Sequence, residues 1–269
     1  MASSSTEAAL HAAYASRGGS QAVFAPKVAD YVASRPDYPQ ALFDRLTELG
    51  ALSPNARIAD IGAGTGLLTA GLLARGHEVV AVEPNDAMRA AADALLHDRP
   101  GYRSVAGSAE TTNLPPASVD LVTAAQAFHW FVVDRTRAEF LRVLATNGQV
   151  ALIWNDRLPD DPLQRAIAVL FRRHGGSERA ALTAHEERLG VQDFYGRGRI
   201  EQIDVPHEQR LGRAGFAALL FSRSYMPPRA SAAGTTAEHD VDALFDAHAE
   251  DGAVVVRYRT IAYVGRPVI

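Results

Sequence analysis

Cysteine is absent from the 269-residue sequence. Its absence excludes disulfide bonds, thiolate zinc sites, iron–sulfur clusters and cysteine nucleophiles. Lysine is nearly absent, because Lys27 is the single lysine among 27 basic residues, so a Schiff-base lysine has only one candidate. No uninterrupted apolar run reaches the roughly 18 residues that a spanning helix needs, so no membrane partner is expected. The nine histidines show neither H-x-x-x-H nor H-E-x-x-H spacing, and no metal site is predicted.

Charge and composition are those of a globular protein. Hydrophobic residues make up 47% and charged residues 22%, which excludes wholesale disorder. The net charge of −4, with both signs interspersed, argues against a nucleic-acid partner. Residues 1–22 are rich in Ala, Ser and Gly and lack a basic segment followed by an apolar core. We therefore expect a flexible tail there, no secretory signal and a cytoplasmic location.

Helical and strand patterns alternate from about residue 39, which predicts βαβ units and a parallel sheet. Five short apolar segments are predicted strands: 56–61, 78–82, 102–105, 119–124 and 149–154. Helices are predicted between them at 39–49, 67–75 and 85–97, and a further helix carries Phe140, Leu141 and Leu144 and stops at Asn147-Gly148. The second half is less regular: helices are expected at 162–173, 215–222 and 240–250, and strands at 200–205 and 254–264. We predict one domain over 23–269, with a cap-like insert at about 157–199.

The strongest local signal is the segment Asp60-Ile61-Gly62-Ala63-Gly64-Thr65-Gly66 between a strand and a helix. A glycine turn at that position lets the backbone approach a ligand closely, with helix N–H groups pointing at it. A dinucleotide motif G-x-G-x-x-G would place its third glycine where Leu67 stands, and no lysine follows as in a P-loop. Asp60, at the strand end, can pair with a cationic ligand or orient the loop. The alternative is a tight turn with no ligand.

A second acid closes the next strand. Glu83 is placed to accept both hydroxyls of a ribose, as the equivalent acid does in nucleotide-binding folds. The alternative is a solvated glutamate ahead of a helix that starts at Pro84. Met88, one turn on, can cover an adenine ring or simply fill the core. The segment Gly107-Ser108-Ala109-Glu110 follows the third strand, and its amides and carboxylate can read an adenine edge.

Taken in order, these motifs resemble the class I S-adenosylmethionine-dependent methyltransferases. The resemblance is greatest to the small-molecule branch that includes trans-aconitate methyltransferase-like enzymes. Besides the glycine segment, Glu83 and residues 108–110, it is carried by Ala125-Gln126-Ala127-Phe128-His129-Trp130-Phe131, by Phe24, Ala29 and Tyr31–Pro39, and by Ser222–Pro227 and Tyr258–Tyr263. It spans about residues 24–265.

The resemblance implies a Rossmann-like α/β fold: a seven-stranded, mostly parallel sheet with helices on both faces and its last strand antiparallel. It also implies S-adenosylmethionine as cofactor and S-adenosylhomocysteine as product. Gly62, Ala63 and Gly64 would face the methionine part, Glu83 the ribose, Ala109 and Glu110 the adenine, and Gln126 the sulfonium. Tyr31 and Arg35 would close over the cofactor, with Arg35 a carboxylate partner. The expected cofactor-binding set is completed by Asp60, Pro84, Met88 and Ser108.

His129 and Trp130 are the predicted acceptor-facing pair, because two aromatic rings beside a sulfonium stabilise the cation and flank a planar substrate. Ordinary packing of Trp130 is the alternative, and His129 as a general base is a separate hypothesis. Such proteins often place Asp directly after His-Trp-Phe, whereas here Val132 and Val133 come first, which leaves the acceptor side open.

The expected function is transfer of a methyl group to an oxygen or nitrogen of a small molecule, by a monomer or homodimer. The alternatives are an NAD-dependent oxidoreductase, which Leu67 disfavours, a cofactor-binding regulatory protein without catalysis, and an RNA or protein acceptor. Residues 24–39 carry three aromatics and Arg35 ahead of the first strand. We predict that they form a lid over the cofactor, the alternative being a permanently docked helix.

Overall fold

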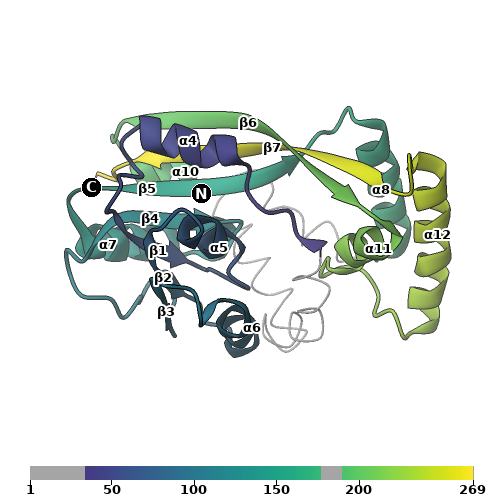
Figure 1. Ribbon diagram of the computed structural model, residues 1–269, viewed down its shortest axis with the longest axis horizontal. Coiled ribbons are helices and arrows are strands. Elements are labelled where there is room, and N and C mark those ends of the chain that lie inside the picture. Colours follow the sequence, from purple (N-terminus) through teal and green to yellow (C-terminus); the bar gives the residue numbers. More distant parts are fainter. Residues whose placement is uncertain (1–33, 177–189, 269) are drawn as a thin grey trace. The chain divides into compact units, whose positions relative to one another are not determined.

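The computed structural model describes residues 34–176 and 190–268 (Figure 1). The chain divides into two compact units. The sheet unit comprises Asp37–Asp156, Arg188–Pro206 and Arg259–Ile269, and the helical unit comprises Met1–Pro36, Arg157–Glu187 and His207–Tyr258. The predicted tail at 1–22 and most of the predicted lid lie outside the described residues. The predicted single domain with a cap-like insert stays a prediction.

Seven strands form one sheet in the order β3-β2-β1-β4-β5-β7-β6. The strands are β1 Arg57–Ile61, β2 Glu78–Val82, β3 Tyr102–Val105, β4 Val119–Ala125, β5 Leu144–Arg157, β6 Ile200–Leu211 and β7 Val254–Gly265. The first five pair in parallel, as in β1 with β2, where Arg57 lies opposite Glu78 and Ile61 opposite Val82. The last strands are antiparallel (Figure 1). The predicted fold class is therefore confirmed.

Helices cover both faces of the parallel strands, because successive side chains of a strand point to opposite sides. In β1, Ile58 lies in one buried cluster, with leucines of α4 (Gln40–Glu48) and α5 (Leu67–Leu73) and with Leu96 of α6 (Asp86–Leu96). Ala59 and Ile61 lie in the other cluster, with residues of α7 (Val133–Val143) and α10 (Val191–Tyr195). Because helices pack on both faces of these strands, neither face has to carry polar side chains toward solvent.

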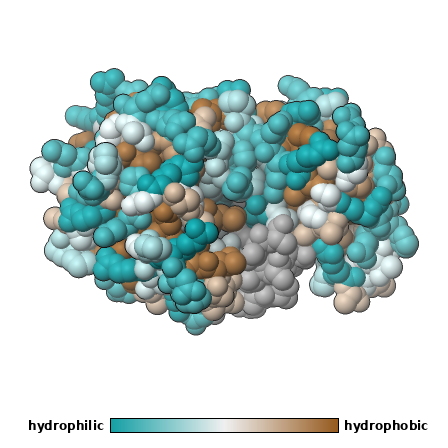
Figure 2. All heavy atoms as spheres, in the orientation of Figure 1, coloured by the Kyte–Doolittle hydropathy of each residue, from teal (hydrophilic) through white to brown (hydrophobic). Residues whose placement is uncertain are grey.

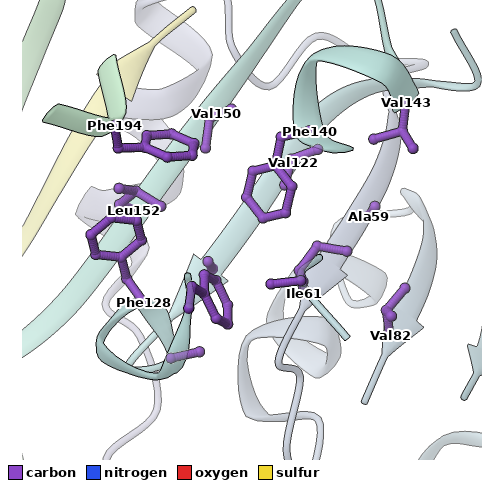
Figure 3. Packing of buried hydrophobic residues seen from close by; sticks show 14 of the residues in the cluster. Ala59, Ile61, Val82, Val122, Phe128, Phe140, Val143, Val150, Leu152 and Phe194 are labelled. Atoms are coloured by element: carbon purple, nitrogen blue, oxygen red, sulfur yellow. The ribbon is translucent and has the colours of Figure 1, made fainter. Parts of the chain in front are cut away.

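Aromatic rings fill the second cluster (Figure 3). Phe128 stands edge-on to Phe194 with ring centroids 5.4 Å apart, and Phe194 stands edge-on to Phe140 at 5.7 Å. Such edge-to-face pairs add about 0.5–1.5 kcal/mol beyond their buried area. Phe128 belongs to η2, a 3-10 turn at Phe128–Trp130 that follows β4 after Gln126 and Ala127, so the cluster fixes the start of that turn.

The helical unit has a hydrophobic core of its own. Its helices are α8 (Pro162–His174), α11 (Arg213–Phe221) and α12 (Ala232–His248), and α12 packs against both others. Asp161 caps α8 by accepting the N–H of Gln164 at 3.0 Å. Buried aromatic residues from each helix, among them Phe171, Phe216 and Phe245, contribute to this core.

Several boundaries differ from the sequence-based expectation. Leu144 begins β5 opposite Val119 instead of ending a helix, and Asn147-Gly148 lie inside β5, where an irregularity in the pairing with β4 accommodates them. Helix α12 begins at Ala232, not at 240, because the Ser231 hydroxyl accepts the N–H of Gly234 at 3.0 Å and caps it. Strand β6 continues to Leu211. The short helix α10 lies within the segment that was expected to be a cap-like insert.

The surface shown in Figure 2 is covered mainly by hydrophilic residues, with apolar residues in small groups. Among the described residues, the large hydrophobic side chains that are exposed are Leu95, Val132, Val169 and Val268. Scattered residues of this kind are ordinary on a protein surface. No helix in the described part of the chain is long and apolar enough to cross a membrane.

Candidate functional site

The glycine segment lies at the carboxyl end of β1, in the middle of the parallel strands. Gly62, Gly64 and Gly66 have φ of +70°, +58° and +82°, values that side-chain-bearing residues rarely adopt. A Cβ on Gly62 would lie 2.7 Å from the Cβ of Ala127, whereas a Cβ on Gly64 would meet nothing within 4 Å. The loop after β1 therefore touches the loop after β4 at Gly62 and leaves open space at Gly64.

Glu83, at the carboxyl end of β2, is bound to the glycine segment. Its Oε2 accepts the backbone N–H of Gly64 at 2.9 Å, and its Oε1 accepts that of Asn85 at 2.8 Å. The side chain is buried, and burial raises the pKa of the Glu83 carboxyl while the two N–H donors oppose the rise. Each oxygen retains a lone pair, so the carboxylate can accept two more hydrogen bonds beside Gly64.

Asp60 is buried beneath the glycine segment. Its two carboxylate oxygens accept the hydroxyls of Thr69 on α5, at 2.7 Å, and Thr123 on β4, at 2.9 Å. Burial raises the pKa of Asp60, and the two hydroxyls oppose the rise. These bonds join β1, β4 and α5 below the glycine segment. This arrangement is consistent with the predicted role of Asp60 in orienting that segment. Direct contact of Asp60 with the cofactor stays a prediction.

The loop after β2 begins α6. Asn85 caps that helix, because its Oδ1 accepts the N–H groups of Ala87 and Met88 at 3.0 and 3.2 Å. Met88 is buried and Pro84 is exposed. Burial of Met88 is consistent both with packing in the core and with contact to an adenine ring, so its role stays a prediction.

The loop after β3 is fixed by two glutamates. Glu110 accepts the backbone N–H of Val132 at 2.9 Å, at the start of α7. Glu139 on α7 accepts the backbone N–H and the hydroxyl of Thr112, at 2.8 and 2.5 Å. Ala109 is buried, and Ser108 exchanges backbone hydrogen bonds with Thr111. The predicted adenine segment is thus a tight turn tied to α7, and sequence reasoning missed Glu139.

Gln126 follows β4 with φ of +55°, a left-handed conformation that is uncommon for glutamine. Its N–H donates to the carbonyl of Ile153 at 2.9 Å, and its side-chain amide donates to the carbonyl of Asn155 at 3.2 Å. The buried side chain of Asn155 donates to the carbonyl of Asp37 at 3.0 Å and accepts the Thr260 hydroxyl at 2.6 Å. Asn155 was also missed, although a polar residue directly after the predicted strand at 149–154 is a usable signal.

His129 and Trp130 lie on η2, directly after this loop. Their ring centroids are 5.1 Å apart with planes inclined by 44°, and both side chains are half-buried. Trp130 packs against the aromatic cluster of Figure 3. The two rings are therefore held together on a segment that the core anchors, and their role toward an acceptor stays a prediction.

Two predicted residues are not placed in this site. Tyr31 lies outside the described residues, and Arg35 belongs to the helical unit. No group of three or more metal-ligating side chains occurs in residues 34–176 and 190–268.

Comparisons with known proteins identify the family. Residues 59–152 match the methyltransferase domain family. An uncharacterized methyltransferase of Mycobacterium tuberculosis is 35% identical over 202 residues, covering 75% of this chain and 76% of its own. The chain belongs to the class I S-adenosylmethionine-dependent methyltransferases.

Other relatives agree with this membership. An uncharacterized methyltransferase-like protein of Schizosaccharomyces pombe is 36% identical over 152 residues, covering 56% of this chain and 58% of its own. A second protein of that yeast is matched over 61% of its length, so the chain spans about three fifths of these two relatives. A solved structure from Anaeromyxobacter dehalogenans, named as a type II methyltransferase, has a TM-score of 0.66 and 29% identity, covering 87% of this chain and 99% of that one.

The residues of this methyltransferase fit the cofactor that its family implies. The open space at Gly64, the remaining lone pairs of Glu83 and the buried Thr65 hydroxyl, which has no hydrogen-bond partner among the described residues, offer a cradle for a polar ligand. Leu67 opens α5 where a dinucleotide motif would need glycine. The site therefore suits S-adenosylmethionine better than NAD.

Proposed function

We propose that the protein binds S-adenosylmethionine and transfers its methyl group to an oxygen or nitrogen atom of a small molecule. The observation that carries the proposal is Glu83, a buried carboxylate fixed beside Gly64 with lone pairs available. A carboxylate at the end of β2 is suited to two vicinal hydroxyls of a ribose. The cofactor would supply an electrophilic methyl group on a sulfonium.

The remaining cofactor contacts follow from the loops at the same edge of the sheet. Gly62, Ala63 and Gly64 would bind the methionine part through their backbone, and Ala109 and Glu110 would border the adenine. Gln126, held in its left-handed conformation by the carbonyl of Ile153, would lie near the sulfonium.

His129 and Trp130 would hold the acceptor. Alignment of two reactants contributes on the order of 7–11 kcal/mol to lowering a barrier. A general base contributes only about 10²–10⁴-fold in rate. We therefore assign the pair mainly to orientation, with deprotonation by His129 needed only for an acceptor that arrives protonated.

A small-molecule acceptor is favoured over RNA by the net charge of −4 and the interspersed charges. The resemblance to the trans-aconitate methyltransferase-like branch supports the same choice. A cytoplasmic location and a monomeric or homodimeric state complete the proposal.

Isothermal titration calorimetry of the full chain with S-adenosylhomocysteine and, separately, NAD tests the cofactor. We expect saturable binding of S-adenosylhomocysteine only. Tight NAD binding without a response to S-adenosylhomocysteine would refute the proposal. Incubation with methyl-labelled S-adenosylmethionine and a cell extract then tests the acceptor class: label in the small-molecule fraction supports it, and label confined to RNA or protein contradicts it. Cofactor binding without label in any fraction would favour the regulatory alternative.

A further inference from the structure

Asn155 interrupts an otherwise apolar stretch of the sheet. Residues 150–154 of β5 are apolar and buried, and Asn155 follows them with 9% of its surface exposed. Its Oδ1 accepts the hydroxyl of Thr260, a fully buried residue of the neighbouring strand β7, at 2.6 Å. Its Nδ2 donates to the carbonyl of Asp37 at 3.0 Å. Since two apolar side chains of the same shape would serve the core about equally well, packing alone does not explain this buried polar pair.

The side chain of Asn155 fixes the backbone to which Gln126 is attached. The Asn155 carbonyl accepts the side-chain Nε2 of Gln126 at 3.2 Å. The backbone N–H of Gln126 donates to the carbonyl of Ile153, two residues earlier on the same strand, at 2.9 Å. Gln126 is therefore joined to β5 at two points, and the bonds from Thr260 and to Asp37 hold the second of these points in place.

This attachment determines which end of the Gln126 amide is available to a ligand. A carbonyl oxygen only accepts hydrogen bonds, so the nitrogen of the amide must be the atom that meets the Asn155 carbonyl. The opposite end is Oε1, which accepts no hydrogen bond within residues 34–176 and 190–268. An amide oxygen is the negative end of its dipole, and it attracts cations and polarised C–H groups.

Gln126 stands where the strand order of the sheet reverses. In the order β3-β2-β1-β4-β5, the chain departs in opposite directions from β1 and β4, and ligands of such sheets bind outside the carboxyl ends of the strands at this point. Gln126 directly follows β4, and the next residue, Ala127, approaches the glycine segment at Gly62. The amide thus belongs to the loops that border the proposed cofactor site.

We propose that Asn155 is a positioning residue, which holds the nitrogen end of the Gln126 amide so that Oε1 is turned toward the sulfonium of the cofactor. The inference rests on the proposed function. The oxygen would attract the positive sulfonium and its methyl C–H groups in S-adenosylmethionine, whereas S-adenosylhomocysteine carries an uncharged thioether and no methyl group. The arrangement would stabilise the bound methyl donor relative to the product and so favour product release.

Calorimetry of the full chain with S-adenosylmethionine and, separately, S-adenosylhomocysteine tests this role. The readout is the ratio of the two dissociation constants, because a general loss of structure weakens both ligands alike. In Gln126→Leu and in Asn155→Leu we expect S-adenosylmethionine to lose about threefold to tenfold in affinity relative to S-adenosylhomocysteine. Thr260→Val, which removes one of the two bonds that fix the Asn155 side chain, should shift the ratio in the same direction. It takes the place of Asn155→Leu if that variant does not fold.

Tyr102→Phe is the matched control. It removes a side-chain hydrogen bond of 2.8 Å to Asp93 in the same unit, on β3 at the far edge of the sheet. It should lower the thermal stability and leave the ratio unchanged.

A double variant separates positioning from a merely structural role. Because Asn155 acts through Gln126, Asn155→Leu combined with Gln126→Leu should show the same ratio as Gln126→Leu alone. An unchanged ratio in Gln126→Leu or in both β5–β7 variants, or additive losses in the double variant, would overturn the inference and leave cofactor binding intact. A wild-type protein that binds neither ligand would overturn the proposed function, and this inference with it.

Discussion

Replacing Glu83 by glutamine is the sharpest test of the cofactor site. The substitution keeps the shape of the side chain, removes its charge and turns one oxygen into an NH₂ group. Because Oε1 and Oε2 each accept a backbone N–H, from Asn85 and Gly64, one of these donors would face another donor in the variant. A buried N–H without an acceptor costs about 1–3 kcal/mol of folding stability.

The substitution should also weaken cofactor binding, independently of the loss of folding stability. A hydrogen bond to a charged acceptor contributes about 1.5–3 kcal/mol, and loss of one such bond weakens binding about tenfold to a hundredfold. We therefore expect the dissociation constant of S-adenosylhomocysteine, measured by calorimetry, to rise by that factor in Glu83→Gln. Thermal unfolding in the absence of ligand reports the stability loss independently.

Asp120→Asn provides the control for this variant. Asp120 also accepts a backbone N–H, that of Arg57 at 3.0 Å. It lies near the amino end of β4, outside the glycine segment. The Asp120→Asn variant should lose part of a surface ion pair and keep its affinity for S-adenosylhomocysteine. A Glu83→Gln variant that folds and binds as tightly as the wild type would refute the reasoning, as would equal losses in the two variants.

Three further outcomes are expected. His129→Ala should leave the affinity for S-adenosylhomocysteine within about twofold of wild type by calorimetry, since the ring is assigned to the acceptor; a loss like that of Glu83→Gln would show that the two sides are misplaced. Gly64→Ala and Gly76→Ala should lose similar stability, about 1 kcal/mol, because both positions have positive φ and open space, but only Gly64→Ala should lose ligand affinity. Hydrogen bonds from Arg142 and Thr112 hold the pKa of Glu139 at about 2, so its contribution to stability is present above pH 4.5, the ordinary value, and is lost as the pH falls toward 2. The stability difference between wild type and Glu139→Gln, from urea unfolding, should therefore be larger at pH 7 than at pH 3, and a difference independent of pH would contradict the assignment.

The parallel sheet and the glycine segment were predictable because their signals are local. Short apolar runs separated by helical patterns specify βαβ units, and three glycines within five residues specify a turn with positive φ. The structure confirms the sheet and places all three glycines at positive φ. These features depend on neighbours a few residues away, so one sequence is sufficient to find them.

Helix α12 shows where local signals fail. Its first turns contain Gly234, Thr235 and Thr236, residues of low helix propensity, which is consistent with the predicted start at 240. Packing of α12 against α8 and α11 and the Ser231 cap outweigh that propensity. Tertiary contacts of this kind cannot be inferred from the hydrophobic periodicity of the segment itself.

The side chains that support the site were missed for a different reason. Thr260 binds Asn155 across 105 residues of sequence, and Thr112 binds Glu139 across 27. Each pair exists only because the strand order and the placement of α7 bring the partners together.

Gln126 links the fold to the proposed chemistry. Asparagine and aspartate tolerate a left-handed backbone, so Asn113 and Asp251 need no special account, but glutamine gains no such help and the conformation costs roughly 1–2 kcal/mol. Hydrogen bonds to the carbonyls of Ile153 and Asn155, both on β5, hold it there. A simple turn after β4 would not need this strain. Because the strained residue stands directly before Ala127, which contacts the position of Gly62, the strain sets how closely the β4 loop approaches the glycine segment. If Gln126 lies near the sulfonium, as the proposed function expects, its strained conformation serves the geometry of the cofactor site.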